Sequence, residues 1–196
     1  MSMSVARARI STRDRILKEA KRLFQRNGYH AVGTAEILQA ANAPKGSMYH
    51  HFPGGKEDIA VAAVKEIRAE VLASMNRLRT RHAATADCVR ALATGMAHWL
   101  GRTHYREGTM LASITVGSVP DLPRLHAAIK QTFDEWRDQL AAWLCDEGWT
   151  KHAAAAMATT ALAAMEGAML VARVARKKTP IIHVANVVAE SMQATR

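Results

Sequence analysis

The sequence predicts an all-α protein, and three observations lead to that expectation. Pro is rare (5 residues) and Gly modest (11), a composition that permits long helices and disfavours a β-sandwich. Apolar residues recur at three- and four-residue spacing through most of the chain, as on the buried face of a helix. Residues 152–176 are rich in alanine, the strongest helix former. With 196 residues, 49% of them apolar, the chain can bury a substantial core.

The first predicted helix covers residues 12–28, with Thr12 as its expected N-cap and Gly28 at its end. Its apolar residues fall on one stripe at helical spacing: Ile16, Leu17, Ala20, Leu23 and Phe24. A shorter helix follows in "GTAEILQAAN" and turns its apolar residues inward: Ile37, Leu38 and Ala41. Asn42 stands where a chain leaving a helix adopts the left-handed conformation. Pro44 suits the first position of a third helix.

The third predicted helix, in "APKGSMYHHFPGGK", has little apolar material to bury. Met48 and Phe52, four residues apart, supply an inward anchor. The other side chains are left facing elsewhere: Lys45, Ser47, Tyr49, His50 and His51. Two helices joined by a three-residue turn and packed on a longer one form a helix-turn-helix, whose second helix enters the major groove of DNA. Lys and Ser can then reach base edges, whereas Tyr and His reach phosphates.

Positive charge gathers in the first 56 residues. The net charge is +10 at pH 7. Residues 1–56 hold ten Lys and Arg against three Asp and Glu, a net of +7, and the other 140 residues hold seventeen against fourteen, a net of +3. A local basic block indicates a polyanion partner, because Lys and Arg contacts with phosphates release condensed counterions. A solvated basic face or a loose basic tail would have the same composition, so charge alone leaves these interpretations open.

Other interpretations of Tyr49-His50-His51 are less well supported. Neighbouring helical residues project about 100° apart and cannot share one metal ion. No nucleophile or carboxylate that a catalytic histidine needs is apparent nearby. One of the two histidines could instead pack, partly buried, against the next helix. Cys88 and Cys145 form neither a disulfide framework nor a paired-cysteine metal motif, so we expect no metal and no cofactor.

Residues 12–58, "TRDRILKEAKRLFQRNGYHAVGTAEILQAANAPKGSMYHHFPGGKED", resemble the tetracycline-repressor (TetR) family of bacterial regulators. The Gly-Tyr, the Ile-x-x-Ala-Ala and the Lys-Gly-Ser-Met-Tyr-His-His-Phe run all fall at family spacing. "APKGSMYHHFPGGKE" is most similar to the LmrA/YxaF-type branch. The resemblance implies an all-α homodimer with a three-helix DNA-binding domain and a ligand-responsive C-terminal domain.

Matching the family motif residue by residue implies specific DNA contacts. Tyr49 and His50 would contact phosphates, Lys56 would contact the DNA backbone, and three residues would form the base-facing edge: Lys45, Gly46 and Ser47. Gly33 stands where many members have a Ser or Thr cap, which moves the expected phosphate contact to Thr34. Gly108-Thr109-Met110 departs from the Gly-Cys-Pro that the branch often carries.

The rest of the chain predicts helices over 56–80, 86–102 and 122–147, with Gly148 ending the last and a loop at "GSVPDLP", residues 117–123. We expect a DNA-binding domain over 1–56 and a ligand-binding and dimerisation domain over 57–196. The start "MSMSVARARISTRD" lacks the apolar core of a signal peptide, so a cytoplasmic protein is expected.

Residues 152–176 are long enough to span a membrane, but Ala and Thr are weakly hydrophobic and Glu166 and Arg173 interrupt the stretch. We expect instead an Ala-rich helix that Gly167 allows to approach helices on more than one side. Together with a last helix over 181–193, it would build a four-helix dimer interface, as in the TetR family.

A ligand pocket is harder to locate from the sequence. Met and aromatic residues line adaptable apolar cavities, and a rare polar group orients the ligand. The candidates are Met96, Trp99, His104, Trp136, Met165, Glu166 and Met169. Met and Trp at helical spacing are more often plain core than pocket lining, and Glu166 could be a structural ion-pair partner of Arg173.

These features and the resemblance together predict a dimeric regulator that a small apolar effector releases from a palindromic double-stranded DNA operator; that it is a repressor is implied by the family alone. An architectural DNA-binding protein with a fully packed C-terminal core is an alternative. So is an enzyme using a C-terminal cavity, although no nucleophile–base pair or metal cluster supports it.

Overall fold

The computed structural model describes residues 10–118 and 121–194, and within them the chain forms nine α-helices and no β-strand. The all-α expectation is confirmed. The helices are α1 (Thr12–Asn27), α2 (Thr34–Ala40), α3 (Lys45–His51), α4 (Lys56–Arg79), α5 (Thr85–Arg102), α6 (Met110–Ser118), α7 (Pro123–Asp146), α8 (Lys151–Ala175) and α9 (Thr179–Ala194).

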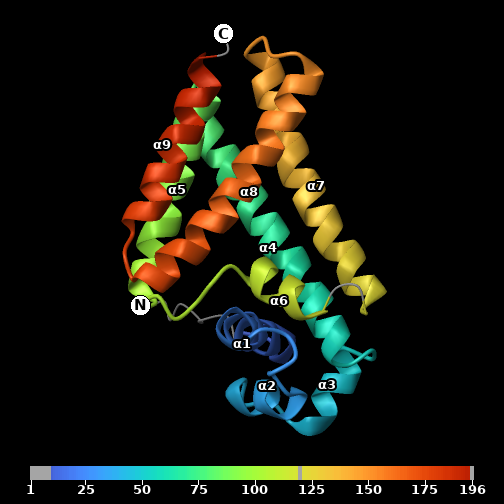
Figure 1. Ribbon diagram of the computed structural model, residues 1–196. Helices are drawn as coiled ribbons and strands as arrows, with labels where there is room; N and C mark the ends of the chain where they lie inside the picture. Colours follow the sequence, from blue (N-terminus) through green and yellow to red (C-terminus); the bar gives the residue numbers. More distant parts are fainter. Residues whose placement is uncertain (1–9, 119–120, 195–196) are drawn as a thin grey trace, which may run out of the picture.

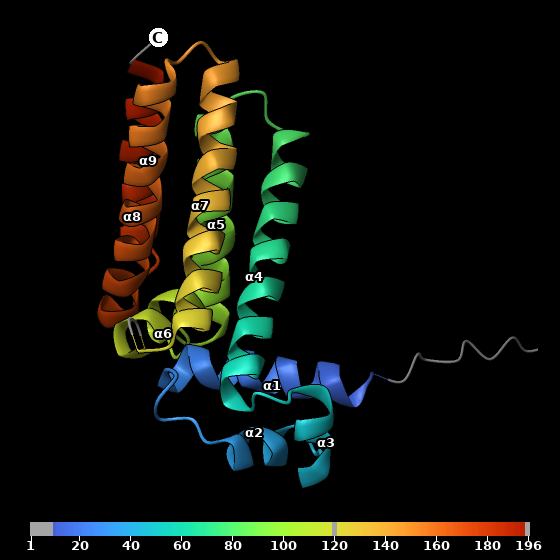
Figure 2. The same cartoon turned by 90° about the vertical axis from the view of Figure 1, so that its right-hand side faces the viewer.

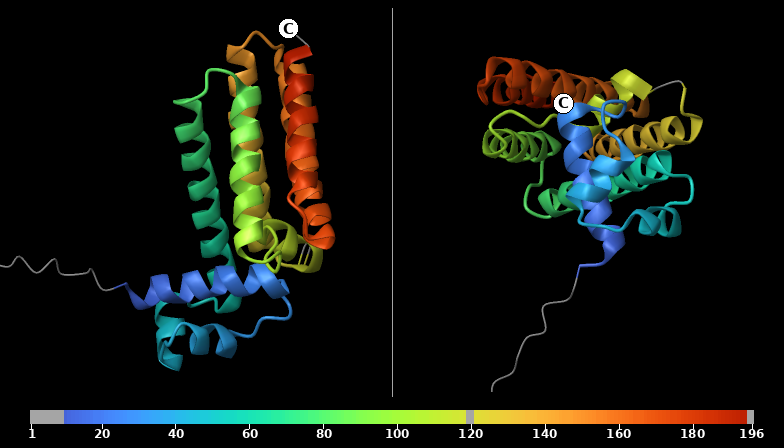
Figure 3. Two further views of the ribbon diagram at one scale, coloured as in Figure 1. Left: turned by 90° about the vertical axis from the view of Figure 1, so that its left-hand side faces the viewer. Right: turned by 90° about the horizontal axis from the view of Figure 1, so that it is seen from below.

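The long helices α4, α5, α7, α8 and α9 stand side by side as a bundle (Figure 2). Helix α1 lies across the lower ends of the bundle, which is clearest in the view from below (Figure 3). Helices α2 and α3 lie beneath α1, at the end of the molecule opposite the C-terminus (Figure 1). The short helix α6 lies between α1 and the bundle and contacts α1 and α7.

The N-terminal helices form as the apolar pattern predicts, with corrections at the caps. The predicted stripe of α1 is buried throughout. Its N-cap is Ser11, whose side chain accepts a hydrogen bond from the Asp14 amide at 3.1 Å, and not Thr12. Asn42 has the predicted left-handed conformation, with φ of 48°. Pro44 is the N-cap of α3 rather than its first helical residue.

Helix α6 was not predicted from the sequence. Its buried residues, Met110, Leu111 and Ile114, face the core between α1 and the bundle. The predicted loop 117–123 is therefore shorter, because residues 117 and 118 belong to α6. Residues 119 and 120 of that loop lie outside the described residues, as do residues 1–9 of the predicted N-terminal start.

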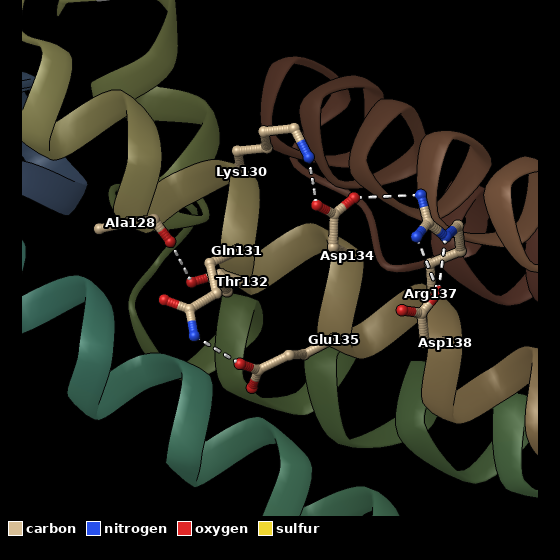
Figure 4. Close-up of polar contacts among 8 residues, drawn as sticks. All are labelled: Ala128, Lys130, Gln131, Thr132, Asp134, Glu135, Arg137 and Asp138. Atoms are coloured by element: carbon tan, nitrogen blue, oxygen red, sulfur yellow. Dashed lines mark hydrogen bonds and ion pairs between the residues drawn. The ribbon is translucent and has the colours of Figure 1, made fainter.

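The charged side chains on the exposed side of α7 form ion pairs with one another (Figure 4). Asp134 accepts from Lys130 at 2.5 Å and from Arg137 at 3.0 Å, and Arg137 also donates to Asp138 at 2.7 Å. Buried Thr132 donates to the carbonyl of Ala128 at 2.8 Å. Surface pairs of this kind support a helix by a few tenths of a kcal/mol each. The charges of α7 therefore have a structural explanation.

Helix α8 is the one described helix long and apolar enough to cross a membrane by length and composition alone. It packs on α7 and α9 through a row of small residues, with Ala154, Ala158, Ala161, Ala168 and Ala172 all buried. Core helices of globular proteins pass the same test, so its composition is weak evidence for a membrane span.

Candidate DNA-binding surface and ligand cavity

Helix α3 is anchored on one side and open on the other. Met48 and Phe52 are buried beneath it, as predicted. Tyr49 is 66% exposed, which is unusual for a large aromatic side chain, and Lys45 and His50 are exposed beside it. The helix thus presents hydrogen-bonding side chains to solvent while a small apolar anchor holds it to α1 and α2.

The two adjacent histidines have different surroundings. His50 is exposed, whereas His51 is half-buried, with its ring edge-on to His50 at a centroid distance of 4.8 Å. His51 also contacts the ring of the buried Phe52. His51 is therefore the packed histidine of the pair, and His50 is the one that can reach a ligand outside the protein.

Gly46 has no structural reason to be glycine. It lies within α3, is exposed, and does not have a positive φ. A Cβ added at residue 46 would meet no heavy atom within 4 Å. Glycine inside a helix lowers stability relative to alanine by about 0.5–1 kcal/mol. Close approach of the backbone to a ligand is a remaining reason for glycine here.

Ser47 and Thr34, the two hydroxyl residues expected to contact DNA, are both half-buried. Ser47 is half-buried and donates its hydroxyl to the carbonyl of Pro44 at 2.6 Å, which leaves its oxygen lone pairs as the group that could accept. Thr34 is half-buried at the start of α2, whose N-cap Gly33 provides no side-chain hydrogen bond.

The first turn of α4 is held in a defined position next to α3. The ammonium of Lys56 lies 4.2 Å from the centroid of the Tyr29 ring, and desolvation by burial lowers the pKa of Lys56. Asp58 accepts from the Gly54 amide at 2.5 Å and forms an ion pair with Arg124 of α7. The Arg124 guanidinium holds the pKa of Asp58 below its usual range, with the Gly54 amide contributing.

Arg15 ties α1 to the turn between α2 and α3. Its guanidinium donates to the carbonyl of Asn42 at 3.1 Å and to the hydroxyl of Thr12 at 3.2 Å. In the same turn of α1, the guanidinium of Arg13 lies 5.5 Å from the centroid of the Phe52 ring. The orientation of α3 is thereby fixed from both of its ends.

A cavity of about 400 Å³ lies within the bundle. Six of the seven predicted ligand residues line it: Met96, Trp99, Trp136, Met165, Glu166 and Met169. His104 does not, because the chain turns after α5 and His104 adopts a left-handed conformation there, with φ of 51°. Its amide donates to the carbonyl of Gly101 at 3.1 Å.

Several lining residues were missed by the sequence analysis, among them Gln25, Met75, Thr109, Met110, Leu140 and Trp143. Leu140 and Trp143 follow Trp136 at helical spacing on α7, so that pattern could have identified them. Gln25 belongs to α1 and Met110 to α6, and no sequence signal brings either to the cavity.

Glu166 is the polar centre of the cavity wall. The hydroxyl of Thr109 donates to its Oε2 at 2.5 Å, and desolvation by burial raises the pKa of Glu166. The alternative pairing with Arg173 is not seen; the Arg173 guanidinium donates instead to the carbonyl of Arg106 at 3.0 Å. No ion pair of Glu166 is found among the described residues.

The segment between α5 and α6 connects the cavity to α1. The amide of Gly108 donates to the carbonyl of Gln25 at 3.2 Å, and the next residue, Thr109, binds Glu166 of α8. Gln25 itself lines the cavity. A change at the cavity wall therefore has a short, hydrogen-bonded route to the helix that supports α2 and α3.

Comparison with known proteins agrees with this architecture. Residues 16–63 match the bacterial regulatory proteins of the tetR family, and residues 85–187 match the transcriptional regulator LmrA/YxaF-like C-terminal domain. The chain is 29% identical over 186 residues to the HTH-type transcriptional regulator LmrA of Bacillus subtilis, covering 93% of this chain and 97% of that protein. It is 32% identical over 174 residues to a helix-turn-helix transcriptional regulator of Mycobacterium tuberculosis, covering 86% and 88%.

Solved structures share the fold. A TetR transcriptional regulator from Legionella pneumophila superimposes with a TM-score of 0.84 at 20% identity, covering 94% of this chain and 98% of that one. The regulatory protein TetR from Rhodobacter sphaeroides gives 0.81 at 21% identity, covering 91% and 97%. The family consists of DNA-binding transcriptional regulators rather than enzymes. The chain therefore belongs to the TetR family of transcriptional regulators and carries an LmrA/YxaF-like C-terminal domain.

Proposed function

We propose that this regulator is a cytoplasmic, homodimeric repressor that binds a palindromic operator through α3 and is released by a small apolar molecule in the bundle cavity. The DNA-binding unit is residues 1–56, and residues 57–196 bind the ligand and the second subunit. The observation that carries the proposal is the hydrogen-bonded connection between the cavity and α1, through Thr109, Gly108 and Gln25.

The exposed face of α3 supports the DNA contacts. Lys45, Gly46 and Ser47 would face base edges at the start of the helix. Phosphates would be contacted by residues of three helices: Tyr49 and His50 on the open side of α3, Lys56 on α4 and Thr34 on α2. The net charge of +7 in residues 1–56 supplies the attraction for the DNA backbone.

The outer faces of α8 and α9 support dimerisation through residues 152–176 and 181–193. Four large apolar side chains are exposed there: Leu170 (65%), Val171 (55%), Val174 (80%) and Val187 (62%). Gly167 lies in the same exposed stripe of α8, with open space where a Cβ would be. An apolar stripe of this kind fits burial against a second copy of the chain. Two copies would place two recognition helices in successive major grooves.

The cavity favours a ligand-responsive regulator over an architectural DNA-binding protein, since a fully packed core would leave no such space. Its wall, as far as the described residues form it, is mostly apolar, and the carboxylate of Glu166 in it is largely desolvated. Pockets that bind small molecules have this composition, in which a few polar groups orient an apolar ligand.

Release would work as a population shift. The ligand must bind more tightly to a dimer in which the two recognition helices lie at the wrong separation or angle for successive grooves. Residues 106–110 are hydrogen-bonded to α8 at two points and to α1 at one, so they can transmit a change in the cavity to α1.

In vitro selection of random duplexes with the purified protein tests the DNA-binding part of the proposal. We expect enrichment of one inverted repeat, and binding that weakens steeply with salt. A screen of small apolar compounds for release of that duplex tests the ligand part. Failure to enrich any sequence would contradict the DNA-binding part. The ligand part would be contradicted if the compounds that release the duplex did not bind in the bundle cavity.

A further inference from the structure

The charge of the cavity wall is opposite to the charge of the protein. The chain carries a net charge of +10, yet within residues 10–118 and 121–194 no Lys, Arg or His lines the cavity. The carboxylates that line it are Glu70 and Glu166. A ligand anion would meet like charge in a poorly solvated space, which disfavours it. The cavity is therefore selective against anions.

Only one of the two carboxylates is available to a ligand. Glu70 is mostly exposed, at 63% for its side chain, and already pairs with Lys21 at 2.8 Å. Among the described residues, Glu166 accepts one hydrogen bond, from the Thr109 hydroxyl to Oε2, and forms no ion pair; the guanidinium of Arg173, on the same helix, donates to the carbonyl of Arg106. A desolvated carboxylate without a cation is unfavourable, and a cation in the cavity would relieve that cost.

The aromatic and sulfur-containing side chains around Glu166 suit a cation with an apolar body. Trp99, Trp136 and Trp143 line the same cavity, and indole faces attract cations electrostatically. Trp143 already does so, since the guanidinium of Arg79 lies 5.5 Å from its centroid. Five methionines add polarizable, adaptable surface: Met75, Met96, Met110, Met165 and Met169.

We propose that the effector is a hydrophobic organic amine, whose ammonium group binds the carboxylate of Glu166 while its apolar body fills the tryptophan-lined cavity. The inference rests on the proposed function in calling this ligand an effector, but the binding itself does not require DNA. An ammonium at Glu166 would compete with the Thr109 hydroxyl, and thereby act on the segment that is bonded to Gln25 of α1.

Matched compounds test the charge preference directly. Each set consists of an aminomethyl, a hydroxymethyl and a carboxylate derivative of naphthalene, anthracene or biphenyl, titrated calorimetrically into the full-length protein without DNA at pH 7.4. The amine of a set should bind at least about tenfold more tightly than its alcohol, since a charge-assisted hydrogen bond replaces a neutral one. The carboxylate should not bind. Equal affinity of amine and alcohol, or no binding of any amine, would overturn the inference.

A variant locates the cation. Glu166→Gln keeps an oxygen acceptor for Thr109 but removes the charge, so amine affinity should fall at least about tenfold while alcohol affinity stays within about twofold. Glu135→Gln, on α7 and outside the cavity, is the control and should change neither. Circular dichroism verifies that both variants keep their helices. Unchanged amine affinity in Glu166→Gln would place the cation elsewhere and overturn the inference.

Operator release separates this inference from the proposed function. Release by alcohols and not by amines would overturn the inference and leave a ligand-responsive regulator. Amine binding at Glu166 without release of the operator would overturn the amine's role as effector. Amine binding by a protein that selects no operator would leave the cation site standing and overturn the proposed repressor function.

Discussion

The ammonium of Lys56 lies 4.2 Å above the ring of Tyr29, a side chain only 7% exposed and packed against Phe24. The contact holds the first residue of α4 in one place beside α3, instead of leaving a long cationic side chain to sample solvent. A fixed cation next to the recognition helix is suited to a phosphate contact at a defined position.

Lys56→Ala should therefore weaken binding to all DNA sequences and reduce the salt dependence, by about one unit of log–log slope. Tyr49→Phe should also weaken binding to every sequence, because a phosphate loses its hydroxyl donor. Lys65→Ala, an exposed position further along α4, is the matched control and should leave the slope unchanged. Fluorescence anisotropy over a range of salt concentrations measures these slopes. If Lys56→Ala kept the wild-type dependence of log affinity on log salt, a phosphate contact by Lys56 would be excluded.

Gly46→Ala should separate folding from DNA binding. Alanine is favoured over glycine inside a helix by about 1 kcal/mol, and the position is open, so the free energy of unfolding should rise. The added methyl group would meet the DNA, and operator affinity should fall about tenfold or more. Gly95→Ala, an exposed glycine of α5, should gain stability without losing affinity. Wild-type affinity in Gly46→Ala would show that the backbone here does not approach DNA.

Gly167→Leu should produce monomers with intact helices. Nothing lies within 4 Å of a Cβ at residue 167 in the single chain, so leucine fits the fold of the monomer. In the dimer it would overpack the contact between subunits, at a cost of roughly 1–3 kcal/mol to dimerisation. Operator binding should be lost with the dimer. Sedimentation equilibrium measures the mass, and Gly95→Leu on α5 should remain dimeric. A wild-type protein that sediments as a monomer yet binds its operator tightly would rule out this interface.

Glu166→Gln should stabilise the protein at neutral pH. Burial raises the pKa of Glu166 above the ordinary glutamate value of 4.5, so the native state binds this proton more tightly than the unfolded state does. The free energy of unfolding of the wild type should therefore fall as pH rises from the unfolded pKa through the raised native one. Glutamine does not titrate, so the variant does not lose this stability as pH rises. Its higher free energy of unfolding at pH 7 should therefore disappear on acidification. Urea unfolding of both proteins across that pH range measures the difference. A wild type more stable than Glu166→Gln at pH 7 would contradict the account.

The helix-turn-helix could be predicted because its signals are local. Each signal involves residues close together in the sequence: the buried stripe from Ile16 to Phe24, the left-handed Asn42, and the Met48–Phe52 anchor. The structure has all three. The cap of α1 was placed one residue late because Ser11 and Thr12 are both good caps, and only the Asp14 amide geometry distinguishes them.

The cavity wall could be predicted only in part. Trp99, Met165 and Glu166 stand out by residue type, but the contact between Thr109 and Glu166 joins positions 57 residues apart. His104 was a reasonable candidate by type, and its backbone turn removes it from the wall. Helix α6 was missed because it is nine residues long, with neither an acidic residue in its first turn nor a basic one in its last to mark its ends.

The spacing of the two half-sites in the selected operator tests the central claim most directly. A dimer whose two α3 helices enter successive major grooves requires half-sites on one face of the duplex. Insertion of five base pairs, about half a helical turn, between the half-sites leaves every base contact available but moves one half-site to the opposite face. We expect the affinity of the wild-type protein to fall at least about a hundredfold, toward non-specific binding. Equal affinity for the two spacings would contradict a dimer that reads DNA through paired α3 helices.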